Sequence, residues 1–174
     1  MTYMIQFCLN NKCVLDINTR CAHRVMSSRT IWGPKIWYML HRLSFFSDRS
    51  DLGGAWKNVL RNLSETMPCT LCRKHMKDYL AANPIKMSGL SGPEFRDMIV
   101  MWLFKFHNHV NASRGASLYD FDQMAAVYGQ RVHIDAVSDA KQVLIDIDNL
   151  WKPQRPWNEA MRYLTGLIGG GSLP

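Results

Sequence analysis

The stretch MPCTLCRKHMKDYL, residues 67–80, contains the end of one helix and the start of another. Pro68 cannot continue the preceding helix and is tolerated in the first turn of the next one. Cys69 and Cys72 then stand three positions apart where that next helix starts. Such a pair can be a metal clamp, a structural staple or a reversible disulfide. The inward positions that follow at helical spacing are Met76, Tyr79 and Leu80.

Helical periodicity extends to both sides of this stretch. A helix is predicted to begin at about Thr30. Either Thr30 or a preceding serine can serve as its N-cap, and Pro34 fits its first turn. Further helices are predicted over about 55–67, 93–112 and 120–128. The positions expected to be buried are Ile36, Met39, Leu40, Leu43 and Phe46 in the first helix, Trp56, Val59, Leu60 and Leu63 in the second, and Phe95, Met98, Ile99, Trp102, Phe106 and Val110 in the long one.

These helices predict an all-α fold, a four-helix bundle plus a short fifth helix, over residues 30–131. No segment shows sustained period-two alternation, and there is no internal repeat. Residues 1–29 lack a clear period and are interpreted as an N-terminal arm that bears cysteines. Residues 132–174 are a C-terminal extension of unknown role, in which 136–151 could add one helix and 168–174 are expected to be flexible.

Length and composition fit one globular domain. The chain has 174 residues, 47% of them hydrophobic and 20% charged, enough to bury a core without disulfide or metal support. No apolar run approaches the roughly 20 residues that span a bilayer, and the N-terminus lacks a secretory pattern. The net charge of +7 is spread along the chain. We therefore expect no membrane span and no nucleic-acid partner.

The five cysteines leave one thiol over from any complete intramolecular pairing. Cys8, Cys13 and Cys21 lie near the N-terminus, and no cysteine follows Cys72. A secreted fold stapled by disulfides would spread its cysteines along the chain. The distribution indicates one reactive pair and a cysteine-bearing arm.

Electrostatics favour a redox role for the CxxC pair. The free N–H groups and the positive end of a helix stabilise a thiolate, and Arg73, Lys74 and His75 add positive charge. A thiolate is the species that attacks disulfides. A structural zinc site stays open as an alternative, with His75 or Cys8 and Cys13 as further ligands, and so do simple buried thiols. A haem-attachment sequence is excluded because Arg73 stands where that sequence needs histidine.

Three motifs, in order, resemble those of the Erv/ALR family of FAD-dependent sulfhydryl oxidases. They are WGPKIWYMLHRLSFF at residues 32–46, PCTLCRKH at 68–75 and WLFKFHNHVN at 102–111. The resemblance covers about residues 31–128 and looks most like the versions carried by large DNA viruses. It implies the Erv/ALR helical fold, FAD as the cofactor with no metal, and oxidation of protein thiols by molecular oxygen to give a disulfide and hydrogen peroxide.

The resemblance also assigns roles to the cysteines. Cys72 is expected to lie against the flavin ring and to pass electrons to it. Cys69 is expected to be the outward thiol that exchanges with a substrate or with a shuttle. Cys8 and Cys13 are the shuttle candidates, and Cys21 is the odd one out, a free thiol, an alternative shuttle partner or the site of an intersubunit bond.

The other motif residues are expected to form the FAD pocket. Asn111 follows Asn108 by three residues and His107 by four. At this spacing the three side chains project to one side of a helix, as a shared ligand requires. The full set that the resemblance assigns to FAD binding is Trp32, Gly33, Pro34, Trp37, His41, His75, His107, Asn108, Val110, Asn111, Arg114, Tyr119 and Tyr128.

The chain departs from the cellular family pattern at three places. Met67 stands where a tyrosine commonly precedes the PCxxC motif, which removes one aromatic contact. Arg114 stands near the place of a usual lysine and can take over some phosphate charge. Phe104 and Phe121 occupy the positions of a structural disulfide, where two apolar rings can pack instead.

The resemblance further implies a homodimer through the first helices, with Trp56 or the Phe45–Phe46 pair as apolar contacts. If the source is viral, the enzyme is expected in the host cytoplasm or the virion, and otherwise in a cellular compartment that forms disulfides. The competing hypothesis is a zinc-stabilised helical interaction module without catalysis. A flavoprotein is yellow, whereas a zinc module is colourless and loses structure with a chelator.

Overall fold

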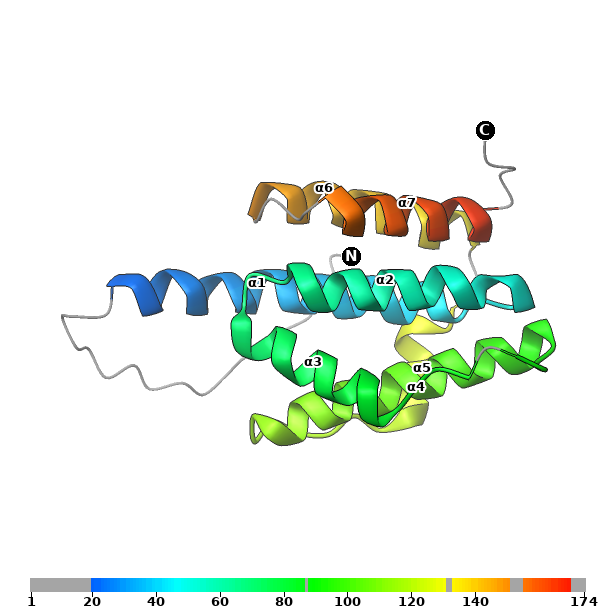
Figure 1. The fold of residues 1–174 in the computed structure, drawn as a ribbon, viewed down its shortest axis with the longest axis horizontal. Coiled ribbons are helices and arrows are strands. Elements are labelled where there is room, and N and C mark those ends of the chain that lie inside the picture. Colours follow the sequence, from blue (N-terminus) through cyan, green and yellow to red (C-terminus); the bar gives the residue numbers. More distant parts are fainter. Residues whose placement is uncertain (1–19, 87, 131–132, 151–154, 170–174) are drawn as a thin grey trace.

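The structure, a computed structural model, describes residues 20–86, 88–130, 133–150 and 155–169. These residues form helices and loops with no strand among them, so the predicted all-α class is confirmed. The helices lie in three layers, with α6 and α7 on one side, α1 and α2 in the middle, and α3, α4 and α5 on the other side (Figure 1). Their bounds are α1 Arg20–Ser44, α2 Gly53–Thr66, α3 Thr70–Ala82, α4 Gly92–Ser113, α5 Phe121–Tyr128, α6 His133–Leu150 and α7 Arg155–Ile168, with a 3-10 turn, η1, at Ser50–Leu52.

Helix α1 begins at Arg20, well before the predicted start near Thr30. The prediction of a cap at Thr30 and of Pro34 in the first turn is therefore wrong, because Pro34 lies inside the helix. A proline there removes the hydrogen bond to the carbonyl four residues earlier. The buried residues that follow hold the helix by packing, since Met39 and Leu40 are each 1% exposed.

Part of the predicted N-terminal arm thus belongs to α1. Residues 20–29 are helical, and Cys21 lies in the first turn. Cys8 and Cys13 are outside the described residues. The extra turns extend α1 past the end of α3 at which the CxxC motif stands (Figure 1), and Arg29 contacts Cys69 at that end.

The starts of α3, α4 and α5 are set by capping side chains. Cys69 caps α3, so Pro68 precedes the helix instead of occupying its first turn. At α4, Ser91 and Glu94 form a reciprocal capping box. At α5, the carboxylate of Asp120 accepts hydrogen bonds from the backbone N–H groups of the two residues at 122 and 123.

The inward stripes predicted from periodicity form one core. Trp56 is fully buried and Trp102 is 8% exposed, which confirms both as core residues. Phe46, Met98 and Val110 are half-buried and pack against this core. The core is continuous from α1 and α2 through α4 to the two C-terminal helices.

The C-terminal extension is a helical pair that covers α1 and α2. The sequence predicted a helix in the region of α6 but missed α7. Helix α6 packs on α1 and α7 packs on α2, with Trp157 of α7 fully buried. Lys35 of α1 pairs with Asp146 of α6 at 2.5 Å, and Tyr38 donates to Asp139 at 2.8 Å.

This cover changes the interpretation of Trp56. Its indole Nε1 donates to Ser47 Oγ at 2.8 Å, and the side chain is 0% exposed. The prediction that Trp56 supplies a contact between subunits is therefore wrong. Phe45 and Phe46 are each half-buried.

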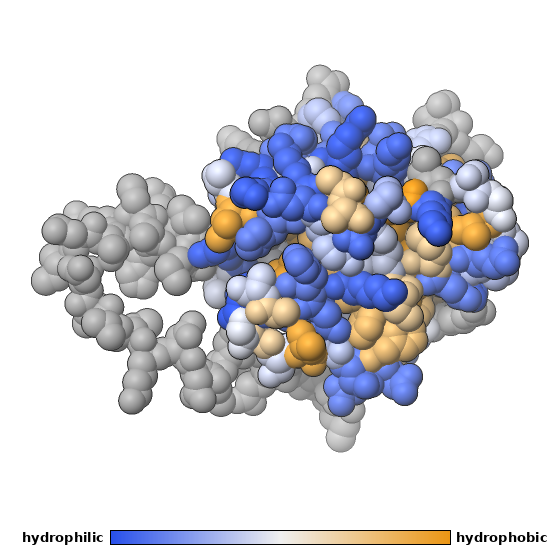
Figure 2. Space-filling model, turned by 60° about the horizontal axis from the view of Figure 1, so that its bottom comes forward, coloured by the Kyte–Doolittle hydropathy of each residue, from blue (hydrophilic) through white to orange (hydrophobic). Residues whose placement is uncertain are grey.

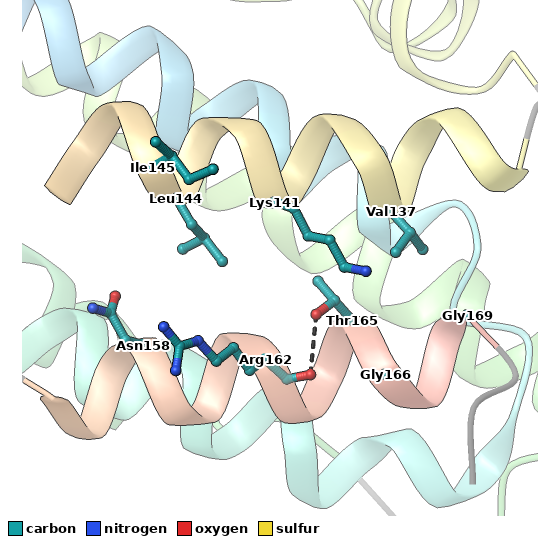
Figure 3. A pocket seen from close by; sticks show the side chains of 9 residues that line it. All are labelled: Val137, Lys141, Leu144, Ile145, Asn158, Arg162, Thr165, Gly166 and Gly169. Atoms are coloured by element: carbon teal, nitrogen blue, oxygen red, sulfur yellow. Dashed lines mark hydrogen bonds between the residues drawn. The ribbon is translucent and has the colours of Figure 1, made fainter. Parts of the chain in front are cut away.

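A cavity of about 590 Å³ lies between α6 and α7 (Figure 3). Lys141 of α6 and Arg162 of α7 project into the space between the two helices. No residue predicted to belong to the catalytic or FAD site lines this cavity. Its lining residues are Val137, Lys141, Leu144, Ile145, Asn158, Arg162, Thr165, Gly166 and Gly169.

The face that carries α3, α4 and α5 is largely hydrophilic, with separate apolar patches (Figure 2). Three large apolar side chains of these elements and their connections are exposed, Leu71 at 57%, Leu118 at 62% and Val127 at 53%. Leu71 stands between the two cysteines of the CxxC motif. Among the described residues, none of the helices is long and apolar enough to cross a bilayer.

Candidate active site

Cys69 and Cys72 are joined by a disulfide at the N-terminus of α3. The backbone N–H of Cys72 donates to Cys69 Sγ at 3.1 Å, so the sulfur acts as the helix cap. A sulfur in this position faces the positive end of the helix dipole. The arrangement is the one that stabilises negative charge on Cys69 when the disulfide opens.

The relative exposure of the two cysteine residues differs from the prediction. Cys69, expected to be the outward thiol, is 5% exposed and belongs to the core cluster, whereas Cys72 is half-buried. Cys69 is therefore buried and does not point outward as predicted, whereas its role as the exchanging thiol stays a prediction. Cys69 packs in the core cluster, and Arg29 of the longer α1 also lies against its sulfur at 3.9 Å.

The charges that follow the pair in sequence are directed elsewhere. Arg73 donates to the carbonyl of Met67 and, at 3.1 Å, to the hydroxyl of Thr70. Lys74 forms an ion pair with Asp78 at 2.7 Å. No contact within the described part of the chain joins His75 to either sulfur. Within the described residues the cation at the sulfur is Arg29, which lies in the predicted arm and was not predicted at the site.

Two histidines meet where α1 crosses α4. His41 Nε2 and His107 Nδ1 are 2.9 Å apart, and the two side chains are 0% and 7% exposed. Burial lowers the pKa of His41 to about 4. Burial, and then the nearby charges of His41 and Arg114, lower the pKa of His107 to about 3. Both rings are therefore neutral near pH 7, and one donates its N–H to the other.

Aromatic rings surround this histidine pair. Trp37 stacks on His107 with the ring centroids 3.9 Å apart and the planes 4° apart. Tyr128 stacks on His41 at 5.0 Å, and Tyr119 lies 4.8 Å from His107. The structure thus brings together Trp37, His41, His107, Tyr119 and Tyr128, five of the residues predicted to bind FAD.

The two predicted asparagines bind the loop after α4. Asn108 donates to the carbonyl of Tyr119 at 3.0 Å and accepts from its N–H at 2.7 Å. Asn111 donates to the carbonyl of Ser117 at 3.2 Å. Their amides therefore hold Tyr119 against His107, a structural role that the sequence did not predict.

The remaining predicted residues stand around this cluster. Trp32 is 5% exposed and lies in the core. Gly33 is half-buried, and Pro34 is exposed on α1. Val110 is half-buried on α4, and Arg114 is the exposed C-cap of that helix, close enough for its charge to lower the pKa of His107.

Phe104 and Phe121 pack against each other with the ring centroids 5.3 Å apart and the planes 88° apart. This edge-to-face contact joins α4 to the start of α5. It confirms the prediction that two apolar rings pack at these positions.

The residues of this site are suited to hold a dinucleotide that carries a flat aromatic ring system. Its rings offer stacking surfaces, and neutral imidazoles offer hydrogen bonds without a buried charge. His41 Nδ1 is buried and has no hydrogen-bond partner among the described residues, so it can serve a ligand. Within those same residues, no group of three or more His, Cys, Asp or Glu side chains is placed to hold a metal ion.

Comparison with known proteins finds relatives that are named as sulfhydryl oxidases. The FAD-linked sulfhydryl oxidase of African swine fever virus is 31% identical over 104 residues, which are 58% of this chain and 82% of that protein. The FAD-linked sulfhydryl oxidase ERV1 of Oryza sativa subsp. japonica is 30% identical over 102 residues, 56% of this chain and 49% of that protein. A protein of Invertebrate iridescent virus 3 is 29% identical over 85 residues, 47% of this chain and 55% of that protein.

No solved structure matches the chain at a significant level. The model of the Erv1 / Alr family matches residues 34–129, which include the CxxC disulfide, the histidine pair and the loop held by Asn108. More than half of the chain therefore carries the family's sequence pattern. The chain belongs to the Erv1/Alr family.

Proposed function

We propose that this protein is an FAD-dependent sulfhydryl oxidase that converts two thiols of a protein substrate into a disulfide. The electrons pass through the Cys69–Cys72 pair and FAD to oxygen, giving hydrogen peroxide. The observation that carries the proposal is the disulfide at the N-terminus of α3 in a chain of the Erv1/Alr family. The stacked histidine and tryptophan rings of α1 and α4 support it.

The chain's own part in the reaction is thiol–disulfide exchange. A substrate thiolate attacks Cys69 Sγ, the bond between the two sulfurs breaks, and Cys72 leaves as a thiolate. The second substrate thiolate attacks the substrate sulfur of this mixed disulfide, and Cys69 leaves as a thiolate. The substrate has then lost two electrons, and these are held by the reduced Cys69 and Cys72. Leu71, 57% exposed between the two cysteines, offers an apolar contact to the incoming substrate.

FAD, when bound, supplies the acceptance of two electrons and the reaction with oxygen. We assign its binding to the rings of Trp37, His41, His107, Tyr119 and Tyr128 and to the charge of Arg114. The neutral imidazoles bind without adding charge to a buried site. Trp32, Gly33, Pro34, His75, Val110, Asn108 and Asn111 complete the proposed set, with the two asparagines acting through the position of Tyr119.

The test of this function is a visible spectrum of the purified full chain, combined with metal analysis and an assay of peroxide formed from a dithiol. We expect a yellow protein with stoichiometric flavin that consumes oxygen when thiol is added. A colourless protein with zinc bound at the two cysteines would instead support the interaction module.

The proposed partners are protein thiols and molecular oxygen. A homodimer stays a prediction, and it would need a face other than the one around Trp56, which the chain's own α6 and α7 cover. Cys8 and Cys13 stay shuttle candidates that relay electrons from substrate to Cys69.

A further inference from the structure

Arg29 is a cation that reaches Cys69 from a distant part of the chain. Its Nη1 lies 3.9 Å from Cys69 Sγ, forty positions apart in sequence. Arg29 is half-buried near the middle of α1, and Cys69 is 5% exposed. A guanidinium this close to a buried sulfur interacts with little screening by water.

The same sulfur accepts the N–H of Cys72 at 3.1 Å. In the disulfide the sulfur is neutral, so neither contact neutralises a charge. When the disulfide opens and Cys69 becomes a thiolate, burial opposes the charged form, and the cation and the N–H favour it. Both contacts are therefore stronger in the reduced state than in the oxidised one.

The other charged groups around the pair have partners of their own. On α3, Arg73 binds Met67 and Thr70, and Lys74 pairs with Asp78. From the end of α2, Glu65 pairs with Lys77 of α3 at 2.8 Å. His75 is half-buried one turn further along α3, without a contact to either sulfur within the described residues. Among the side chains that the structure describes, Arg29 is thus the charged group that directly faces Cys69.

We propose that Arg29 is a further catalytic residue, which stabilises the Cys69 thiolate formed when the substrate disulfide leaves. This inference rests on the proposed function for its role in turnover. In the step concerned, the second substrate thiolate bonds to the substrate sulfur, and the bond between that sulfur and Cys69 Sγ breaks. The electron pair of the broken bond goes to Cys69, where the guanidinium and the N–H of Cys72 receive the charge.

The direct test measures the thiolate and needs neither flavin nor turnover. In full-length Cys72→Ser protein, Cys69 is a free thiol and residue 72 keeps its backbone N–H. The rate of alkylation of Cys69 by iodoacetamide is followed from about pH 5 to pH 10 by peptide mass spectrometry, so that the other three cysteines do not contribute. The profile is compared among the Arg29→Gln, Arg29→Lys and Arg61→Gln variants in this background. Arg61 is the matched control, an exposed α2 arginine that contacts Asn58 at 3.2 Å.

We expect Arg29→Gln to move the midpoint of the profile upward by about 1 pH unit, the size typical of losing an opposite charge within a few ångströms. Arg29→Lys should move it by less, because the charge is kept on a different head group, and Arg61→Gln should leave it in place. Coincident profiles for Arg29→Gln and Arg61→Gln overturn the proposal. If the glutamine variant does not fold by circular dichroism, Arg29→Met, which keeps a long side chain without the charge, takes its place, and a midpoint that coincides with that of Arg61→Gln overturns the proposal.

Activity gives the second measurement in the wild-type cysteine background. Arg29→Gln should lower kcat for a dithiol substrate, because the departing Cys69 thiolate loses its cation, and Arg29→Lys should recover part of the rate. A kcat of Arg29→Gln equal to that of Arg61→Gln, or no recovery by lysine, overturns the catalytic role. A colourless, inactive wild-type protein would refute the proposed function, whereas the alkylation result would still decide the contact between Arg29 and Cys69.

Discussion

His41 Nε2 of α1 and His107 Nδ1 of α4 are 2.9 Å apart inside the protein. One N–H serves both rings, so the pair is satisfied at this contact when both imidazoles are neutral. A proton added to the pair would place a charge at a site where His41 is fully buried. The packing of α1 against α4 at this point therefore depends on both histidines being neutral.

Acid should destabilise the fold through this pair. The pKa of His41 is about 4 in the folded protein and about 6.5 unfolded, so the unfolded chain binds more protons between these values. The contribution is fully present above pH 6.5 and is lost as pH falls toward 4. From pH 7 to pH 5 we expect His41 to lower the free energy of unfolding by about 2 kcal/mol, measured by urea denaturation.

Two variants test this assignment. His41→Gln keeps a polar group in reach of His107 and removes one titration, so its stability should depend less steeply on pH. His109→Gln changes an exposed histidine on α4 and should keep the wild-type slope. Equal slopes for the wild type and His41→Gln would contradict the coupling.

Cys72→Ser should separate cofactor binding from chemistry. Cys72 is half-buried beside the core, and serine is close to it in size, so we expect a folded, yellow protein. Without the second sulfur no disulfide can form in the pair, and oxygen consumption with a dithiol should fall to the uncatalysed rate. An active Cys72→Ser enzyme would show that the pair is not the redox centre.

The shuttle role predicts a difference between large and small substrates. The double variant Cys8→Ala, Cys13→Ala should lose much of its rate toward a folded protein thiol and keep its rate toward a small dithiol. The Cys21→Ala variant, assayed in the same way, shows whether Cys21 is the alternative shuttle partner. An undiminished rate of the double variant toward the protein substrate would argue against a shuttle.

The C-terminal pair of helices should stabilise the whole fold. Trp157 of α7 is fully buried, so Trp157→Ala should lower the free energy of unfolding by about 3–5 kcal/mol through lost burial and a residual cavity. Tyr163 on the same helix is 43% exposed, and Tyr163→Ala should cost far less. If α6 and α7 packed only loosely on α1 and α2, both variants would unfold at about the same temperature as the wild type.

Substitution of glycine by alanine should have opposite effects on stability at two positions. A Cβ at Gly92 would stand 1.8 Å from the carbonyl oxygen of Asp48, so Gly92→Ala must shift backbone and should cost at least about 1–3 kcal/mol. A Cβ at Gly54 in α2 meets nothing within 4 Å, and Gly54→Ala should stabilise by about 0.5–1 kcal/mol. Thermal unfolding separates the two, and similar shifts would contradict the close approach of α4 to Asp48.

Periodicity was sufficient for the helices that bury a regular stripe. In α2 the stripe of Trp56, Val59, Leu60 and Leu63 is buried as predicted. The first turns of α1 carry apolar residues at positions 21, 22, 25 and 26, but the serines that follow and Pro34 resemble the start of a helix, so the prediction began near Thr30 and left Arg29 outside it. In α7 the signal was present and overlooked, since Trp157, Met161, Leu164 and Ile168 recur at helical spacing and are buried.

The sequence predicted which residues lie at the site better than it predicted which side chains contact one another. The motifs named His41, His107 and Asn108, but spacing within one helix does not show which groups meet across two helices. The bond from His41 to His107 depends on the crossing of α1 and α4. The two bonds from Asn108 to Tyr119 depend on the path of the loop after α4.

The double hydrogen bond from Asn108 to the main chain of Tyr119 also bears on affinity. A loop must lose conformational freedom before its residues can grip a ligand, and each side chain or segment fixed at that moment weakens binding. Here folding itself immobilises Tyr119. The binding surface is thus preorganised. A ligand that stacks beside His107 contacts a Tyr119 that is already ordered, so its binding costs no further conformational entropy in this loop.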